Sequence, residues 1–396
     1  MCPYASIDWE TKGPEESEDY YSSFFKKLGF VIPKDRAVKV VIKPYSMMTV
    51  STVNVTAGTY ENKASGILAL SYADDFEYSD HASDYLSKRG NAPRYTTDQG
   101  GAFEVETVDG NNVLVQKITS DIKPKDWGST SEPVTNLGDD RWSDYSVSVD
   151  AYFAEGVSDN KNPYVGVGAR YNLADANFSG YWLKLWNNGK CELMKNTASV
   201  AETEIESFDA DIMHTLKIAA CENVIDCIVD GETVLSFEDT EKLVISGRAA
   251  IYSSYHNNYF DNLKIESIED HDPYITRWDD LDAEIAYSEG SNVDDGNGWY
   301  HNTMCSFKNY NRTSSDGHAG DTIEFSFNGS TFAVLGQTSS AFIKVEIDEE
   351  IIEEEITCTG GARQASYYKY GLDKSEHKVK ITVIDGTLQL DAIEYK

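Results

Sequence analysis

The sequence is poor in basic residues and in long apolar runs. Lysine and arginine number 34 against 67 aspartate and glutamate residues in a chain of 396, which gives a formal net charge of −33. The basic residues do not gather into a stripe, so the surface charge that binds nucleic acid or anionic membranes is missing. No stretch reaches the roughly 18 consecutive apolar residues of a transmembrane helix. We therefore expect neither a nucleic-acid partner nor a membrane span.

Cysteine and proline are also scarce. The six cysteines contain no CxxC pair, which fits neither a disulfide framework nor a zinc site. We expect mostly buried free thiols, with a Cys305–Cys358 disulfide as the less favoured alternative.

The first residues lack a basic segment followed by an apolar stretch, so no secretion signal is expected in this chain. The aromatic residues (15 Phe, 25 Tyr, 7 Trp) far outnumber the 9 prolines, and this composition indicates a folded protein.

Period-two alternation dominates the segments that carry a clear pattern. Apolar and polar residues alternate along Tyr145–Tyr152 and again along Ala341–Ile347, as in half-buried strands. Asp-Gly and Asn-Gly dipeptides stand beside such runs and favour tight hairpins. Acidic residues and isoleucines interleave between Glu349 and Ile356, which is typical of an exposed hairpin edge more than of a metal site. These patterns predict an antiparallel all-β protein.

Two polar connectors, at 56–65 and 268–273, divide the chain. They predict an N-terminal piece at 1–57, a first domain at 66–268 and a second domain at 277–396. The domain sizes suit two β-sandwiches of the jelly-roll type. Strands are also expected at Val38–Ile42 and Met48–Val53. The family resemblance described below implies that they are the terminal strands of an incomplete β-sandwich.

Several short segments between residues 38 and 266 occur together in a characteristic order. They are Lys43-Pro44-Tyr45-Ser46, Asp74-Asp75-Phe76, Asp98-Gln99-Gly100-Gly101, Gly166-Val167-Gly168-Ala169-Arg170, His214-Thr215-Leu216 and Phe260-Asp261-Asn262. This order resembles the C-terminal part of galactosylceramidases, glycoside hydrolase family 59, including their lectin-like domain. Members of that family carry a catalytic (β/α)8 barrel ahead of these segments. Such a barrel needs roughly 250 residues, and neither of the family's catalytic glutamates has a counterpart here.

The resemblance implies a non-catalytic, carbohydrate-binding region of a family 59-like galactosidase, which would recognise galactose-containing or plant polysaccharide glycans. It also implies a bacterial parent protein outside the cell or at its surface. Two alternatives stay open. The chain could be a component of an active glycoside hydrolase whose barrel is on a longer or separate chain, or it could be a glycan-binding adhesion protein.

The second domain resembles the galactose-binding-like sandwiches of bacterial polysaccharide-degrading enzymes. The resemblance rests on Gly298-Trp299-Tyr300, on Gly320–Phe325 and on Leu390–Glu394. Trp299, Tyr300 and Tyr310 stand in a polar loop region, where aromatic rings could face solvent and stack on sugar rings. They are the candidate carbohydrate-binding residues. Trp182 and Trp186 are spaced to share one face of a strand, where core packing is favoured over sugar contact.

A calcium ion is expected in the first domain. Asp75 and Glu77 lie near its start and Asp261 near its end, where the first and last strands of a jelly roll usually pair. Carboxylate oxygens are the ligands that hard cations prefer. By resemblance, the family's lectin-like domain holds calcium at these places, with a backbone carbonyl that the turn 109–112 would supply here. Surface acids without a metal are the alternative.

Overall fold

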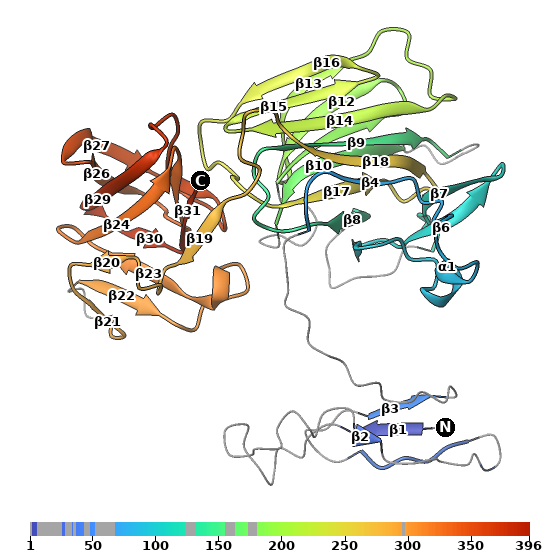
Figure 1. Cartoon of the computed structure of the whole chain (residues 1–396), viewed down its shortest axis with the longest axis horizontal. Coiled ribbons are helices and arrows are strands. Elements are labelled where there is room, and N and C mark those ends of the chain that lie inside the picture. Colours follow the sequence, from blue (N-terminus) through green and yellow to red (C-terminus); the bar gives the residue numbers. More distant parts are fainter. Residues whose placement is uncertain are drawn as a thin grey trace. The chain divides into compact units, whose positions relative to one another are not determined.

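A computed structural model describes residues 68–122, 132–154, 163–172, 180–294 and 298–396, together with short segments at 2–5, 26–27, 34, 37–42 and 48–51. The chain forms two compact units, Met1–Gly66 and Ile67–Lys396 (Figure 1). Residues 56–65, where a connector is predicted, lie in the first unit and outside the described residues. None of the described helices has the length and apolarity needed to cross a membrane.

The N-terminal unit contains a small antiparallel sheet. Its strands are β1 (Cys2–Ala5), β2 (Lys26–Lys27) and β3 (Met48–Ser51), in the order β2-β1-β3. The predicted strand at Met48–Val53 is thus present in its first four residues. The strand predicted at Val38–Ile42 is wrong, because these residues pair with no strand in the described part of the chain and leave the Val41 and Ile42 side chains exposed. Alternating apolar residues form a strand only where a neighbouring strand completes the hydrogen bonds.

The first sandwich consists of a seven-stranded and an eight-stranded antiparallel sheet. The seven-stranded sheet has the order β13-β12-β11-β10-β17-β8-β5, and the eight-stranded sheet has the order β16-β15-β14-β9-β18-β7-β6 with β4 paired to β18. The strands are β4 (Tyr72–Asp74), β5 (Thr97–Gln99), β6 (Phe103–Val108), β7 (Asn111–Gln116), β8 (Val134–Leu137), β9 (Tyr145–Tyr152), β10 (Tyr164–Tyr171), β11 (Tyr181–Trp186), β12 (Lys190–Lys195), β13 (Ala198–Glu204), β14 (His214–Cys221), β15 (Val224–Val229), β16 (Glu232–Glu238), β17 (Arg248–Ser253) and β18 (Tyr259–Ser267), with a single-turn helix α1 (Tyr85–Lys88).

The second sandwich is built from three small sheets, ordered β19-β31-β25-β28, β20-β24-β29-β26-β27 and β21-β22-β23-β30. The strands are β19 (Thr276–Asp279), β20 (Ala286–Tyr287), β21 (Gly290–Ser291), β22 (Trp299–Asn302), β23 (Ser314–Gly317), β24 (Thr322–Gly329), β25 (Phe332–Leu335), β26 (Ala341–Ile347), β27 (Glu350–Cys358), β28 (Ala365–Lys369), β29 (Ser375–Gly386), β30 (Leu388–Leu390) and β31 (Ala392–Tyr395). The all-β prediction is confirmed, and the acidic strand β27 lies at a sheet edge as expected.

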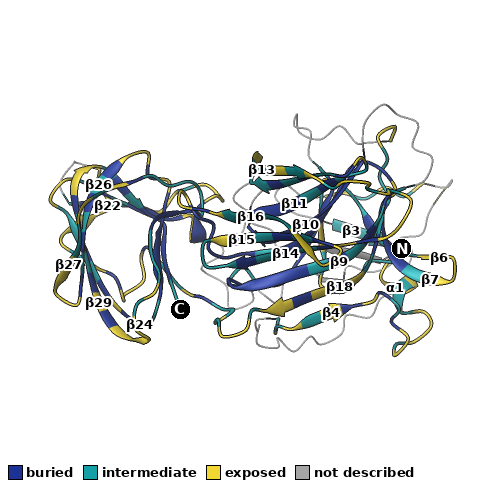
Figure 2. Ribbon diagram, turned by 90° about the horizontal axis from the view of Figure 1, so that it is seen from above, coloured by how far each residue is buried: buried dark blue, intermediate teal, exposed yellow. Residues whose placement is uncertain are grey.

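Buried residues concentrate in the strands of both sandwiches (Figure 2). One hydrophobic cluster fills the space between the two large sheets, and it continues into the second sandwich through Leu335, Ala365 and Ala392. A hydrogen bond from the backbone N–H of Ala365 to the carbonyl of Leu243, 2.8 Å long, also joins the two sandwiches. They therefore share part of one core. Among the described cysteines, all five thiols are free.

Candidate functional site

A separate cluster of aromatic residues lies on the face of the seven-stranded sheet that points away from the main core. Trp182 and Trp186 project from β11 to this face, whereas the intervening Leu183 and Leu185 belong to the core. The cross-strand register places Trp186 opposite Tyr164, and it places Gly166, the next residue of β10 on this face, opposite Tyr252. We call Tyr164, Trp182, Lys184, Trp186 and Tyr252 the aromatic face.

Two glycines on β10 let the aromatic rings lie against the sheet. A Cβ atom at Gly168 would come within 2.7 Å of the Tyr252 ring, and one at Gly166 would come within 3.2 Å of the Tyr252 Cβ. With this space free, the Trp182 and Tyr252 rings stack with centroids 4.4 Å apart and planes 14° apart. Both side chains are buried. They form the floor of the aromatic face.

The accessible part of the aromatic face carries polar groups beside a half-buried indole. The Trp186 indole N–H donates to the Glu192 carboxylate at 2.6 Å. The Lys184 ammonium lies 4.1 Å from the ring centroids of both Trp186 and Tyr164, and burial lowers its pKa. The Tyr164 hydroxyl donates to Glu132 at 2.6 Å. An apolar ring flanked by charged hydrogen-bonding groups is the arrangement that binds the apolar face and the hydroxyl groups of a sugar.

The predicted carbohydrate-binding residues of the second sandwich are not brought together on a free surface. The expectation that Trp299 faces solvent is wrong, since its side chain is fully buried and its indole N–H donates to the carbonyl of Thr322 at 3.1 Å. The reason is Gly317 on the neighbouring strand β23, which leaves room for the ring: a Cβ atom there would lie 2.6 Å from it.

Tyr310 is also buried, because positive charges cover its ring. The guanidinium carbon of Arg277 lies 3.8 Å from the ring centroid, and that of Arg363 lies 4.4 Å from it. Tyr300 is half-buried on β22. Of the three predicted residues, Tyr300 alone keeps an accessible side chain.

The predicted calcium ligands are partly gathered around the β6–β7 hairpin. Glu77 accepts a hydrogen bond from the backbone N–H of Asn112 at 2.9 Å, and Asp261 accepts one from the Asn111 side chain at 2.8 Å. Burial raises the pKa of Asp261, and the negative charges of Asp150 and Glu77 raise it further. Asp75 is exposed and accepts a hydrogen bond from the backbone N–H of Glu77. The predicted turn therefore contacts Glu77 and Asp261, but it does so through the Asn112 backbone N–H and the Asn111 side chain, whereas the expected contribution was a backbone carbonyl. Asp150 also lies near Asp261, which the sequence did not predict.

A second acidic cluster, not expected from the sequence, lies inside the second sandwich. Asp280 and Asp391 are buried, and Asp279 is half-buried beside them. One carboxylate oxygen of Asp279 and one of Asp391 have no hydrogen-bond partner. Burial raises the pKa of Asp280 to about 6 and that of Asp391 to about 8. The three carboxylates do not each bring an oxygen within 4.8 Å of the other two, as a shared metal ion would need, and the positive charge of Arg363 already acts on Asp391.

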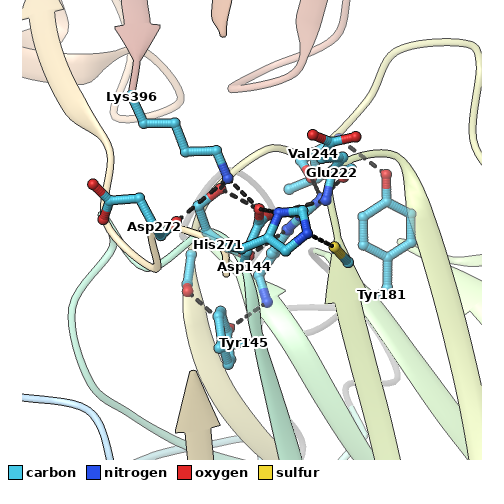
Figure 3. A network of polar contacts seen from close by, with 12 residues as sticks. Asp144, Tyr145, Tyr181, Glu222, Val244, His271, Asp272 and Lys396 are labelled. Atoms are coloured by element: carbon cyan, nitrogen blue, oxygen red, sulfur yellow. Dashed lines mark hydrogen bonds and ion pairs between the residues drawn. The ribbon is translucent and has the colours of Figure 1, made fainter. Parts of the chain in front are cut away.

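A buried ionic network connects the two sandwiches at Asp144 (Figure 3). Its carboxylate lies 3.1 Å from Arg170 and 3.2 Å from the Nδ1 of His271, and it also pairs with Lys396. The Nε2 of His271 lies 3.5 Å from the Cys221 thiol. The arrangement of Cys221, His271 and Asp144 is similar to that of a Cys-His-Asp catalytic triad.

The charges of this network do not suit nucleophilic catalysis. Burial and the negative charge of Asp144 raise the pKa of the Cys221 thiol to about 11, whereas a reactive cysteine needs a lowered pKa. Arg170 and Lys396 already neutralise Asp144, so the carboxylate is not free to stabilise an imidazolium or a bound metal ion. The network is a structural connection between the sandwiches.

The sequence contained one signal for the aromatic face. Gly166 and Gly168 are spaced by two, as are Trp182, Lys184 and Trp186, so each set occupies one side of its strand. Tyr164 and Tyr252 could not be assigned to the aromatic face from the sequence, because their place in it depends on which strands are neighbours in the sheet. Local sequence patterns do not specify the order of strands.

No protein-family model and no curated protein sequence matches this chain. Solved structures similar to part of it include the carbohydrate binding module CBM66 from Bacillus subtilis, at 15% identity and a TM-score of 0.34 over 44% of this chain and 96% of that one. A Bacillus subtilis protein of unknown function with a galectin-like fold matches at 9% identity and a TM-score of 0.34, over 50% and 94% of the two chains. The Ca2+-bound exoplasmic/lumenal domain of VIP36 matches at 12% identity and a TM-score of 0.32, over 47% and 96%.

Proposed function

We propose that this chain binds carbohydrate on the aromatic face of its first sandwich and does not itself catalyse a reaction. The observation that carries the proposal is the half-buried Trp186 ring, held by Glu192 and Lys184 above a floor of stacked rings. A rigid aromatic surface costs little conformational entropy when a sugar stacks on it. The neighbouring charged groups can then exchange hydrogen bonds with the sugar hydroxyls.

The finer parts of the proposal come from the sequence resemblance. They are a bacterial family 59-like galactosidase as the parent protein, galactose-containing or plant polysaccharide glycans as ligands, and a place outside the cell or at its surface, where such glycans occur. A structural calcium ion belongs to the same set. It would be held by Asp75, Glu77 and Asp261, the ligands that the resemblance implies.

A glycan array with the intact chain tests the binding function, and the Trp186→Ala variant tests the site. We expect the variant to lose affinity for the best ligand by about tenfold or more, since a ring contact of roughly 1.4 kcal/mol corresponds to a factor of ten. Tyr152→Ala is the matched control, because Tyr152 is a half-buried aromatic residue on β9 of the other large sheet, where it stacks on Tyr259. Equal losses in the two variants would contradict a specific role of the aromatic face.

Hydrolysis of a nitrophenyl galactoside separates binding from the enzymatic alternative. We expect no turnover by the purified chain. Turnover that a single carboxylate substitution abolishes would overturn the non-catalytic reading. An adhesion role instead predicts binding to host glycans without a preference for polysaccharides.

A further inference from the structure

A row of side chains crosses the outer face of the four-stranded sheet β21-β22-β23-β30 in the second sandwich (Figure 1). The register places Tyr300 of β22 opposite Asp316 of β23, and it places Asp316 opposite Gln389 of β30. Trp299 and Leu390, the chain neighbours of this row, belong to the hydrophobic core. Because side chains alternate along a strand, the row points away from that core. The three side chains are half-buried, so solvent reaches them.

The carboxylate of Asp316 is held in place by one oxygen, and its other oxygen is left over. Oδ1 accepts a hydrogen bond from Nε2 of Gln389 at 3.0 Å, and Oε1 of Gln389 accepts one from the backbone N–H of Gln337 at 3.1 Å. Oδ2 of Asp316 accepts no hydrogen bond from the described residues, and it is not enclosed by them. Asp316 therefore offers a fixed and accessible hydrogen-bond acceptor.

An amide donor lies two residues along β22 from Tyr300. Side chains two positions apart on a strand share one face, so Asn302 stands beside Tyr300 on the outer face of the sheet. Oδ1 of Asn302 accepts a hydrogen bond from the backbone N–H of Met304 at 2.9 Å, which orients the amide. Nδ2 of Asn302 has no partner among the described residues and remains a donor. The Tyr300 ring is thus flanked by an acceptor on the neighbouring strand and a donor on its own strand.

We propose that Tyr300, Asn302 and Asp316, which we call the Tyr300 surface, form a second carbohydrate site that binds one neutral sugar unit of a glycan. The ring suits the apolar face of the sugar, and the flanking donor and acceptor suit its hydroxyl groups. Burial raises the pKa of Asp316, although Gln389 and His318 act against this rise, and the negative charge of Asp294 adds to it. With two carboxylates at this surface, a uronic acid would be repelled.

The Tyr300 surface rests on the proposed carbohydrate-binding function but not on the aromatic face. The aromatic face is formed by residues of β10, β11 and β17 in the first sandwich, and the two sets share no residue. A substitution in one set therefore leaves the other intact. The Trp186→Ala variant, which disables the aromatic face, isolates the Tyr300 surface in the full chain.

Isothermal titration calorimetry of the full chain tests the site, with lactose, cellobiose and mannobiose as neutral probes and digalacturonate as the charged probe. In the Trp186→Ala background, we expect at least one neutral probe still to bind and digalacturonate not to bind. Adding Tyr300→Ala should weaken the remaining binding about tenfold, as loss of a ring contact does. Tyr300→Phe keeps the ring and should change the affinity little.

The Asp316→Asn variant tests the hydrogen bond without removing the side chain. It should also weaken binding about tenfold, because an amide donor replaces the free acceptor oxygen. The melting temperature should stay the same, since the amide oxygen still accepts the hydrogen bond from Gln389. Tyr152→Ala and Asp226→Asn are the matched controls, because both residues are half-buried in the first sandwich, and they should leave the affinity unchanged.

Each other outcome decides against one site or both. An affinity that either Tyr300→Ala or Asp316→Asn leaves unchanged, or no neutral probe bound in the Trp186→Ala background, overturns the Tyr300 surface as a sugar site. Digalacturonate binding that Tyr300→Ala abolishes overturns the neutral ligand. Losses caused by Tyr300→Ala and Asp316→Asn but not by Trp186→Ala uphold the Tyr300 surface and refute the aromatic face. No binding of any probe to the wild-type chain refutes both.

Discussion

Replacing Asp144 with alanine should destabilise the first sandwich by about 3–5 kcal/mol at neutral pH. The side chains of Asp144 and Arg170 are both 0% exposed, and their charged atoms lie 3.1 Å apart. Without the carboxylate, Arg170 keeps its hydrogen bonds to the carbonyls of Ser143, Glu222 and Val244. Its charge, however, remains buried without its nearest counter-charge. Breaking a buried ion pair by removing one partner carries this large cost.

The pH dependence of the destabilisation by Asp144→Ala tests whether its origin is electrostatic. Although burial alone would raise the pKa of Asp144, the charges of Arg170 and Lys396 hold it below its usual value. A carboxyl whose pKa is lower in the folded state stabilises the fold above its unfolded value of about 3.9, and that contribution is lost as the pH falls through the folded value. The difference between wild type and Asp144→Ala should therefore be complete at pH 7 and shrink below about pH 4.

Urea denaturation of both proteins at pH 7 and pH 3 measures this difference. Asp226→Ala, which removes a half-buried acid from β15, is the control and should change the free energy of unfolding by less than about 1 kcal/mol. The Asp144→Ala/Arg170→Met double variant should lose less than the sum of the single variants, since both charges leave together. A loss below about 1 kcal/mol for Asp144→Ala, or the same loss at both pH values, would refute the reasoning.

Two further predictions concern residues of the second sandwich and the proposed calcium site. Trp299→Ala should cost about 3–5 kcal/mol in chemical denaturation, as truncation of a buried aromatic side chain does; a loss under about 1 kcal/mol would restore the solvent-facing interpretation. If calcium binds only the native state, a free calcium concentration one hundred times the dissociation constant stabilises that state by about 2.7 kcal/mol. A chelator should therefore lower the melting temperature. Asp261→Ala should remove this effect, and a wild-type melting temperature that a chelator leaves unchanged would rule out the calcium site of the first sandwich.

The sequence predicted strands well where alternation was long and the partner strands were near in the chain. The strands β9 and β26 have the residue bounds that their alternation indicated. Asp109-Gly110, Asn188-Gly189 and Asp230-Gly231 each turn a hairpin between consecutive paired strands. Asn328-Gly329 and Asp385-Gly386 instead end strands whose successors belong to other sheets. A local turn signal fixes the backbone of the turn but not the sheet that the chain enters next.

The candidate sites were harder to predict because they depend on long-range neighbours. Trp299 stands among polar residues in the sequence, yet it packs on Gly317, which is 18 positions away and has no side chain to exclude it. Tyr310 stands in a polar loop region of the sequence, but the two arginines that cover its ring come from distant segments. Conversely, the core-like spacing of Trp182 and Trp186 did not reveal that their side of the sheet faces away from the main core.

The hydrophobic core that continues from one sandwich into the other determines how the protein can bind a polymer. Modules joined by a flexible linker search a range of separations, and each binding event is nearly independent of the next. Here Leu335, Ala365 and Ala392 extend the core of the first sandwich into the second. The first sandwich is consequently held at one distance and one angle from the second, so a glycan chain bound to the first contacts the second only if its own repeat and curvature match.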